Sequence, residues 1–150
     1  MDGGPGLSES YPAVAESVPR GREALTRLAR TAGADDEQLE AIRLAASEAL
    51  TNAVLHAYGD EPGQVHVTAA VNDGELWMLI ADDGRGLGVR TSRPGLGMGL
   101  ALIAAMADYF AVVRRAGGGT EVRMAFATGA PSNGRPAQER GSASSANAPA

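Results

Sequence analysis

Two consecutive apolar runs that meet at Asn72-Asp73-Gly74 predict a β-hairpin, and therefore a fold that contains a sheet. From Val65 to Val71, aliphatic residues alternate with polar or small ones, which is typical of a strand that buries one face. The second run, Leu76–Ala81, is apolar throughout. We therefore expect a second layer of structure to cover this hairpin.

Two helical patterns precede the hairpin. Pro19 can begin a first helix that Gly33 ends, and Asp35 and Asp36 can cap a second helix that runs to about Ala57. The second helix carries an apolar stripe, formed by Leu39, Ile42, Ala46, Leu50, Ala53 and Ala57.

The chain after the hairpin predicts a helix over Leu100–Asp108 and two strands, Phe110–Arg114 and Glu121–Ala127, around Gly117-Gly118-Gly119. The order of elements is then helix, helix, strand, strand, helix, strand, strand. This order predicts an α+β fold: a two-layer sandwich in which helices cover one face of a mixed, mostly antiparallel sheet.

The composition of the two ends limits the folded domain to residues 11–128. Residues 1–10 are rich in Gly, Pro and Ser, and we expect them to be flexible. Residues 129–150 contain no Val, Ile, Leu, Met or aromatic side chain. Such a segment buries too little apolar surface to offset the entropy of ordering, so a disordered tail is predicted.

Charge and residue usage exclude several classes of protein. All 13 basic residues are arginine, so the lysine that P-loops and eukaryotic-type protein kinases place on the phosphates is missing. A net charge of −5 without a basic stripe argues against direct nucleic-acid binding. The chain has no cysteine, which excludes disulfides. It shows neither a signal-peptide pattern nor a membrane-spanning run, so we expect a cytoplasmic protein without membrane contact.

Glu48 and Asn52 lie one turn apart on the second predicted helix, about 40° from each other around its axis. Both point away from the apolar stripe. A carboxamide oxygen can ligate Mg²⁺ while a neighbouring carboxylate acts as a general base. Taken alone, the pair also fits a solvated polar face.

Asp82-Asp83-Gly84-Arg85-Gly86 follows directly after a predicted strand. The Asp82 carboxylate can accept a hydrogen bond from the amine of a base, and Gly84 and Gly86 leave room for a ligand near the backbone. A simple strand-to-loop turn is the alternative interpretation.

Two more glycine-rich segments complete the set. Gly95, Gly97 and Gly99, followed by Leu100, open a helix whose free backbone N–H groups can bind phosphates. Gly118-Gly119-Thr120 precedes the last strand, where a plain turn is the alternative.

In this order and spacing, the four segments resemble the GHKL (Bergerat-fold) ATPase superfamily, which includes gyrase-type ATPases and the catalytic domains of histidine kinases. Glu48 and Asn52 look like its N-box. Asp82, Gly84 and Gly86 look like the first glycine box, and Gly95-x-Gly97-x-Gly99 like the second. Gly119-Thr120 looks like the terminal box. The segment from Ser47 to Tyr58 is most similar to the bacterial anti-sigma factor and serine-protein kinase branch.

The resemblance implies ATP and Mg²⁺ as cofactors, with Glu48 as general base, Asn52 as metal ligand and Asp82 as adenine anchor. It also implies a homodimer. The implied partners are a sigma factor and an anti-anti-sigma protein of the STAS type. Arg20 and Arg22 open the first helix, and the resemblance suggests that this region contacts the sigma factor.

Three functions stay open on the sequence. The first is an anti-sigma factor that phosphorylates a serine of its antagonist, favoured by the retained base Glu48. The second is a non-catalytic, ATP-gated binding module, favoured by the short segment Leu87–Pro94 between the two glycine boxes. The third is a kinase in a partner-switching pathway without a sigma factor.

Overall fold

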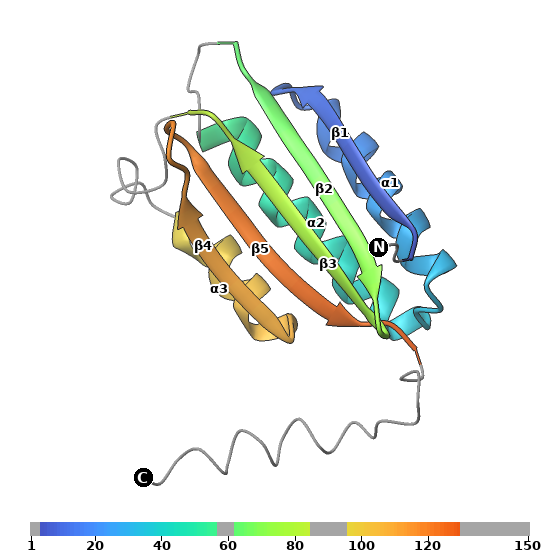
Figure 1. Cartoon of the computed structure of the whole chain (residues 1–150). Coiled ribbons are helices and arrows are strands. Elements are labelled where there is room, and N and C mark those ends of the chain that lie inside the picture. The colour runs from blue at the N-terminus through green and yellow to red at the C-terminus, as the bar shows by residue number, and fades with distance from the viewer. Residues whose placement is uncertain (1–3, 57–61, 85–95, 130–150) are drawn as a thin grey trace, which may run out of the picture.

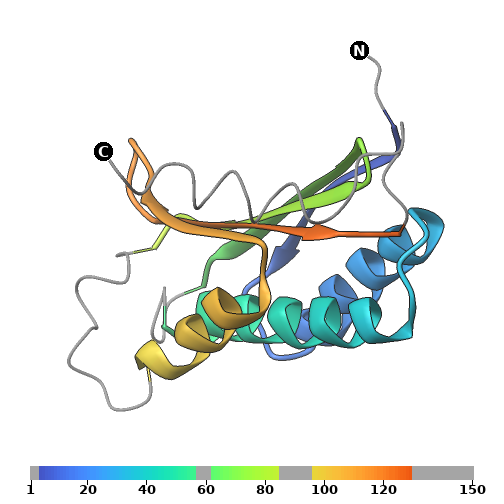
Figure 2. The same ribbon diagram turned by 90° about the horizontal axis from the view of Figure 1, so that it is seen from below.

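The computed structural model describes residues 4–56, 62–84 and 96–129, and these form two layers. Five strands make one sheet, and three helices cover one of its faces (Figures 1 and 2). In chain order the elements are β1 (Gly6–Pro12), α1 (Ser17–Thr31), α2 (Asp36–His56), β2 (Gln64–Asn72), β3 (Glu75–Asp82), α3 (Leu96–Met106), β4 (Tyr109–Arg114) and β5 (Thr120–Ala127). The predicted two-layer α+β sandwich is confirmed.

The sheet has the strand order β1-β2-β3-β5-β4, and every neighbouring pair is antiparallel. The expectation of a mixed sheet was therefore wrong for the described strands. The crossover through α3 carries the chain from β3 past one strand position to β4, and β5 then returns between them. β3 and β4 thus run in the same direction without being hydrogen-bonded neighbours.

The β2–β3 hairpin forms where the sequence predicts it. Asn72 pairs with Glu75, so the loop has two residues, Asp73 and Gly74, with φ angles of 55° and 79°. Positive φ at both positions is the requirement of a type I′ turn, which Asp-Gly meets well. The register of this turn places Val65 opposite Asp82 at the far end of the hairpin.

The N-terminal segment differs from the expectation. Residues 6–10, predicted to be flexible, belong to the edge strand β1, which pairs with β2. Among the residues of β1 only Tyr11 is buried, and it is 5% exposed. An edge strand held mainly by backbone hydrogen bonds needs little apolar patterning, so composition alone gives no sign of it.

Helix α2 packs against the helix-covered face of the sheet. Its N-terminus is a reciprocal cap, because the Gln38 amide donates to Oδ1 of Asp35 and the Asp35 amide donates to Oε1 of Gln38. The predicted stripe is buried from Leu39 to Ala53. No helix within the described ranges is long and apolar enough to cross a membrane.

Removing residues 130–150 is expected to shift the melting temperature by less than about 2 °C, because that segment has no apolar anchor. Gly129, where the predicted tail begins, is described, whereas 130–150 lie outside the described residues. The matched control is a chain that also lacks Thr128, which is buried and donates its amide to the Gly74 carbonyl. Calorimetry should show a clear loss of stability only for this control. A drop of many degrees for the shorter deletion would place the domain boundary further along the chain.

Candidate functional site

Helix α3 begins against the pair Glu48 and Asn52 of α2. A β-carbon on Gly99 would lie 2.5 Å from Oε1 of Glu48 and 3.7 Å from Nδ2 of Asn52. A side chain at position 99 would require the Glu48 carboxylate to move, so glycine lets the two groups lie this close together. The first turn of α3, where backbone N–H groups have no partner within the helix, therefore lies directly beside a carboxylate and a carboxamide.

Helix α3 starts at Leu96, earlier than the predicted Leu100, and ends at Met106. Gly97 and Gly99 thus belong to its first turn. Glycine disfavours helix interiors, which explains why the sequence pattern placed the start later. Leu100 packs against the core cluster, which fixes the first turn of α3 to the rest of the domain.

The carboxamide of Asn52 is the least satisfied polar group at this place. Its Nδ2 atom is buried and has no hydrogen-bond partner among the described residues. A buried polar group left in this way costs roughly 1–3 kcal/mol, so such a group points to a bound ligand. Since the amide can rotate to exchange its oxygen and nitrogen, it can turn its oxygen to a cation.

Asp82 ends β3 as a buried carboxylate, only 6% exposed. Its Oδ1 accepts the Gly84 amide at 2.9 Å, and the backbone amide of Thr120 also hydrogen-bonds to it. Burial raises the pKa of Asp82 above its usual value, and the two amide donors offset only part of this effect. A buried carboxylate with an accepting oxygen is suited to recognising an amine.

Gly119 allows the start of β5 to reach Asp82. It has a φ of 98°, and a β-carbon there would lie 2.0 Å from the Asp82 carbonyl oxygen. Thr120, one residue later, is buried beside it. The described part of the predicted first glycine box therefore packs against the predicted terminal box, whereas the sequence could only place the two separately.

These groups lie at one end of the molecule. The ends of α2 and β3, the start of α3 and the β4–β5 turn come together on the left in both views (Figures 1 and 2). The remaining predicted site residues, Gly86 and Gly95, lie outside the described residues, as does Leu87–Pro94. The described groups fit Mg²⁺-ATP: a carboxamide that can offer its oxygen to the metal, a helix start for phosphates and a buried acceptor for an amine.

The sequence interpretation missed three side chains next to this site. Arg115 donates to the Asp82 carbonyl oxygen at 3.2 Å and to Oδ1 of Asp83 at 2.5 Å. His66 contacts Oδ2 of Asp83 at 2.8 Å. The register of the predicted hairpin already places His66 opposite Ala81, which lies two residues before Asp83 on the same face, but only the fold brings Arg115 there.

Known proteins resemble this chain in sequence. A family model described as the histidine kinase-like ATPase domain matches residues 11–126. The anti-sigma F factor of Clostridium acetobutylicum is 33% identical over 99 residues, which cover 59% of this chain and 69% of that protein. The serine-protein kinase RsbW of Listeria monocytogenes is 34% identical over 92 residues, covering 61% of this chain and 59% of its own length.

A solved structure agrees with these sequence relatives. The crystal structure of the RsbU and RsbW domains of Rv1364c from Mycobacterium tuberculosis matches with a TM-score of 0.66 at 26% identity. The match covers 83% of this chain and 32% of that one. Since the family model spans most of the domain that carries the site, the chain belongs to the histidine kinase-like ATPase domain family.

Proposed function

We propose that this domain binds Mg²⁺-ATP, transfers its γ-phosphoryl group to a serine of an anti-anti-sigma protein of the STAS type, and also sequesters a sigma factor. The observation that carries the proposal is the packing of Gly99 against Glu48 and Asn52. This packing brings together a helix start, the Glu48 carboxylate and a carboxamide whose Nδ2 atom has no hydrogen-bond partner among the described residues. The relatives named anti-sigma factor and serine-protein kinase support the same function.

The proposed chemistry divides between two residues of α2. Bound ATP would supply the γ-phosphoryl group, with ADP as the leaving group, and Mg²⁺ would supply positive charge that neutralises the phosphates. Glu48 takes the proton of the attacking serine hydroxyl, which makes that oxygen a competent nucleophile. Asn52 would hold the metal through its carboxamide oxygen, because Mg²⁺ bound to phosphates needs few protein ligands.

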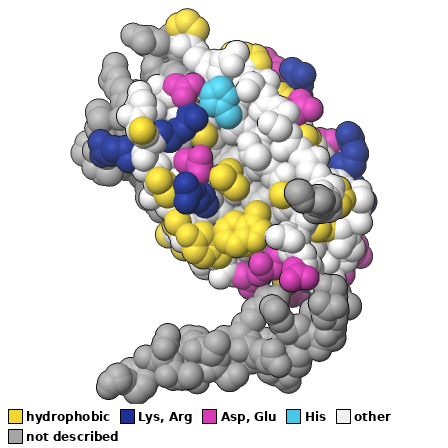
Figure 3. Space-filling view, viewed as in Figure 1, with side chains coloured by type: hydrophobic (Ala, Val, Ile, Leu, Met, Phe, Trp, Pro, Cys, Tyr) yellow, Lys and Arg dark blue, Asp and Glu magenta, His cyan; other side chains and the backbone are white. Residues whose placement is uncertain are grey.

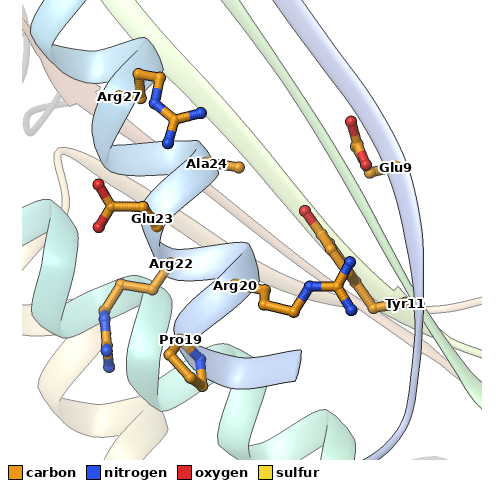
Figure 4. A pocket seen from close by; sticks show the side chains of 8 residues that line it. All are labelled: Glu9, Tyr11, Pro19, Arg20, Arg22, Glu23, Ala24 and Arg27. Atoms are coloured by element: carbon orange, nitrogen blue, oxygen red, sulfur yellow. The ribbon is translucent and has the colours of Figure 1, made fainter. Parts of the chain in front are cut away.

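The proposed partner surface lies on α1. A cavity of about 560 Å³ opens between β1 and α1 and is lined by Glu9, Tyr11, Pro19, Arg20, Arg22, Glu23, Ala24 and Arg27 (Figure 4). Arg20 extends toward β1, with its guanidinium 5.4 Å from the centre of the Tyr11 ring. Arg22 instead points toward α2, where it donates to the Ser47 hydroxyl at 3.2 Å. A partner on α1 would therefore bind next to the helix that carries Glu48.

The test is incubation of the chain with labelled ATP, Mg²⁺ and a purified anti-anti-sigma protein. Transfer of label to a serine of that protein is the expected result. Binding of ATP without any transfer would favour the ATP-gated binding module, which the short segment Leu87–Pro94 supports. Co-purification from the native cell distinguishes a sigma factor from another partner.

Asp82→Asn is expected to weaken ATP binding by about 10- to 150-fold, which corresponds to the roughly 1.5–3 kcal/mol of a hydrogen bond to a charged acceptor. If the amide oxygen keeps the Gly84 bond, the new NH₂ group replaces the second oxygen, so a donor faces the adenine amine. Calorimetric titration with ATP measures the change. Unchanged affinity would remove adenine recognition from this residue.

The same variant should retain its melting temperature at pH 7. Because burial raises the pKa of Asp82 in the folded state, the wild type loses stability as pH rises from the ordinary carboxyl pKa through the raised one. Asparagine does not ionise, so the stability of the variant relative to wild type should increase over this interval. A relative stability that falls with rising pH would contradict the raised pKa.

A further inference from the structure

A chain of hydrogen bonds crosses the sheet on the face that no helix covers. The Ser10 hydroxyl of β1 lies 2.8 Å from Nδ1 of His66 on β2, and Nε2 of His66 lies 2.8 Å from Oδ2 of Asp83. Asp83 also accepts from Arg115, which follows β4. Figure 3 shows this face, on which acidic and basic side chains gather beside a histidine. We call these four residues the open-face relay.

The relay ends on the main chain of the proposed adenine anchor. Nη1 of Arg115 donates both to Oδ1 of Asp83 and to the carbonyl oxygen of Asp82. The Asp82 carbonyl also contacts Gly119, and the Asp82 carboxylate holds the Gly84 amide. Three groups thus hold the segment 82–84 in place: the carbonyl of Asp82, the buried carboxylate of Asp82 and the side chain of Asp83.

Stability alone does not account for this arrangement. The side chains of His66 and Arg115 are 31% and 34% exposed and that of Asp83 is 54% exposed, and isolated ion pairs at such sites contribute little. Their hydrogen bonds nevertheless lower the pKa of Asp83, with the His66 contact as the largest cause, so the carboxylate stays charged and fixed. The relay therefore fixes the position of Asp82, the residue that precedes Asp83.

We propose that Arg115, Asp83 and His66 are positioning residues that hold Asp82 in the orientation that recognises the adenine amine. This inference rests on the proposed function, because it assumes that Asp82 binds adenine. Displacements of about 1 Å are enough to weaken a directional contact of this kind. Loss of the relay therefore weakens the contact between Asp82 and the adenine amine. The contribution of the phosphate contacts to ATP affinity stays unchanged.

The experiment compares ATP with purine ribonucleoside triphosphate, which lacks the 6-amino group. Affinities for both are measured with Mg²⁺ on the wild type, Arg115→Ala, His66→Ala and Arg115→Lys. The ratio of the two affinities reports the amine contact alone. We expect this ratio to fall about 5- to 10-fold in Arg115→Ala, less in His66→Ala, and to recover partly in Arg115→Lys, which keeps a charged donor.

Arg123→Ala is the matched control. Arg123 lies on the same open face and pairs with Glu121 at 2.6 Å, but its partner is not in the segment 82–84. Its affinity ratio should equal that of the wild type. Melting temperatures of all variants show whether a change follows from unfolding.

Two results would overturn the inference. A wild-type ratio in Arg115→Ala, whether both affinities are unchanged or both fall equally, would show that the relay does not position Asp82. A wild type that binds the two nucleotides equally would instead remove the adenine role of Asp82, and with it the premise taken from the proposed function.

Discussion

Glu48→Gln is expected to slow phosphoserine formation on the antagonist by about 100-fold or more, with Mg²⁺-ATP affinity within a few fold of the wild type. Glutamine has the same shape as glutamate, so the close contact with Gly99 is preserved. It cannot accept the serine proton. Ground-state binding should persist because it is assigned to Asn52, Asp82 and the start of α3.

Asn52→Ala is the variant to compare with Glu48→Gln, because it should affect ATP binding as well as phosphorylation. It should lose metal-dependent ATP binding and phosphorylation together, because the metal neutralises charge that develops on the phosphates. A time course of phosphoserine formation beside an ATP titration, run on both variants, separates the two roles. Wild-type phosphorylation by Glu48→Gln would show that Glu48 is not the base.

Gly119→Ala is expected to destabilise the domain by roughly 3–5 kcal/mol and to abolish measurable ATP binding. A methyl group would lie 2.0 Å from the Asp82 carbonyl oxygen and 2.8 Å from Cα of Asp83, both backbone atoms that cannot swing away. The φ of 98° adds strain for any residue with a side chain. The segment 82–84 must then separate from β5, and the bond from Thr120 to the Asp82 carboxylate is lost with it.

The neighbouring glycines provide graded controls. Gly117 has no atom within 4 Å of an added β-carbon and no positive φ, so Gly117→Ala should be close to neutral. Gly118 has equally open space but a φ of 108°, and its replacement should cost only about 1–2 kcal/mol of backbone strain. Thermal unfolding should rank the three variants in that order. A mild effect at Gly119 would mean that the terminal box does not determine the position of Asp82.

The parts of the fold that sequence predicted are those with local signals. The cap at Asp35, the stripe from Leu39 to Ala53 and the turn at Asp73-Gly74 each depend on residues close together in the chain, and each is confirmed. The strand β1 has no such signal, because it is a polar edge strand. The early start of α3 was missed because its first turn contains glycines, and glycine in a sequence is typical of a loop.

The candidate site also has parts that the sequence predicts and parts that only the fold shows. Residue type and order predict Glu48, Asn52 and Asp82 as candidate site residues from the sequence alone. Their supporting contacts could not be predicted, because each joins segments distant in sequence. Gly99 meets Glu48 only after α3 packs on α2, and Arg115 meets Asp82 only after β5 inserts beside β3.

The most direct test is a crystal structure of this chain with Mg²⁺ and a non-hydrolysable ATP analogue. We predict the adenine amine within about 3 Å of the Asp82 carboxylate, the metal about 2.1 Å from the Asn52 carboxamide oxygen, and the phosphates at the first turn of α3. Glu48 should face the γ-phosphate without binding the metal. A nucleotide bound between β1 and α1, or a metal held without Asn52, would contradict the account.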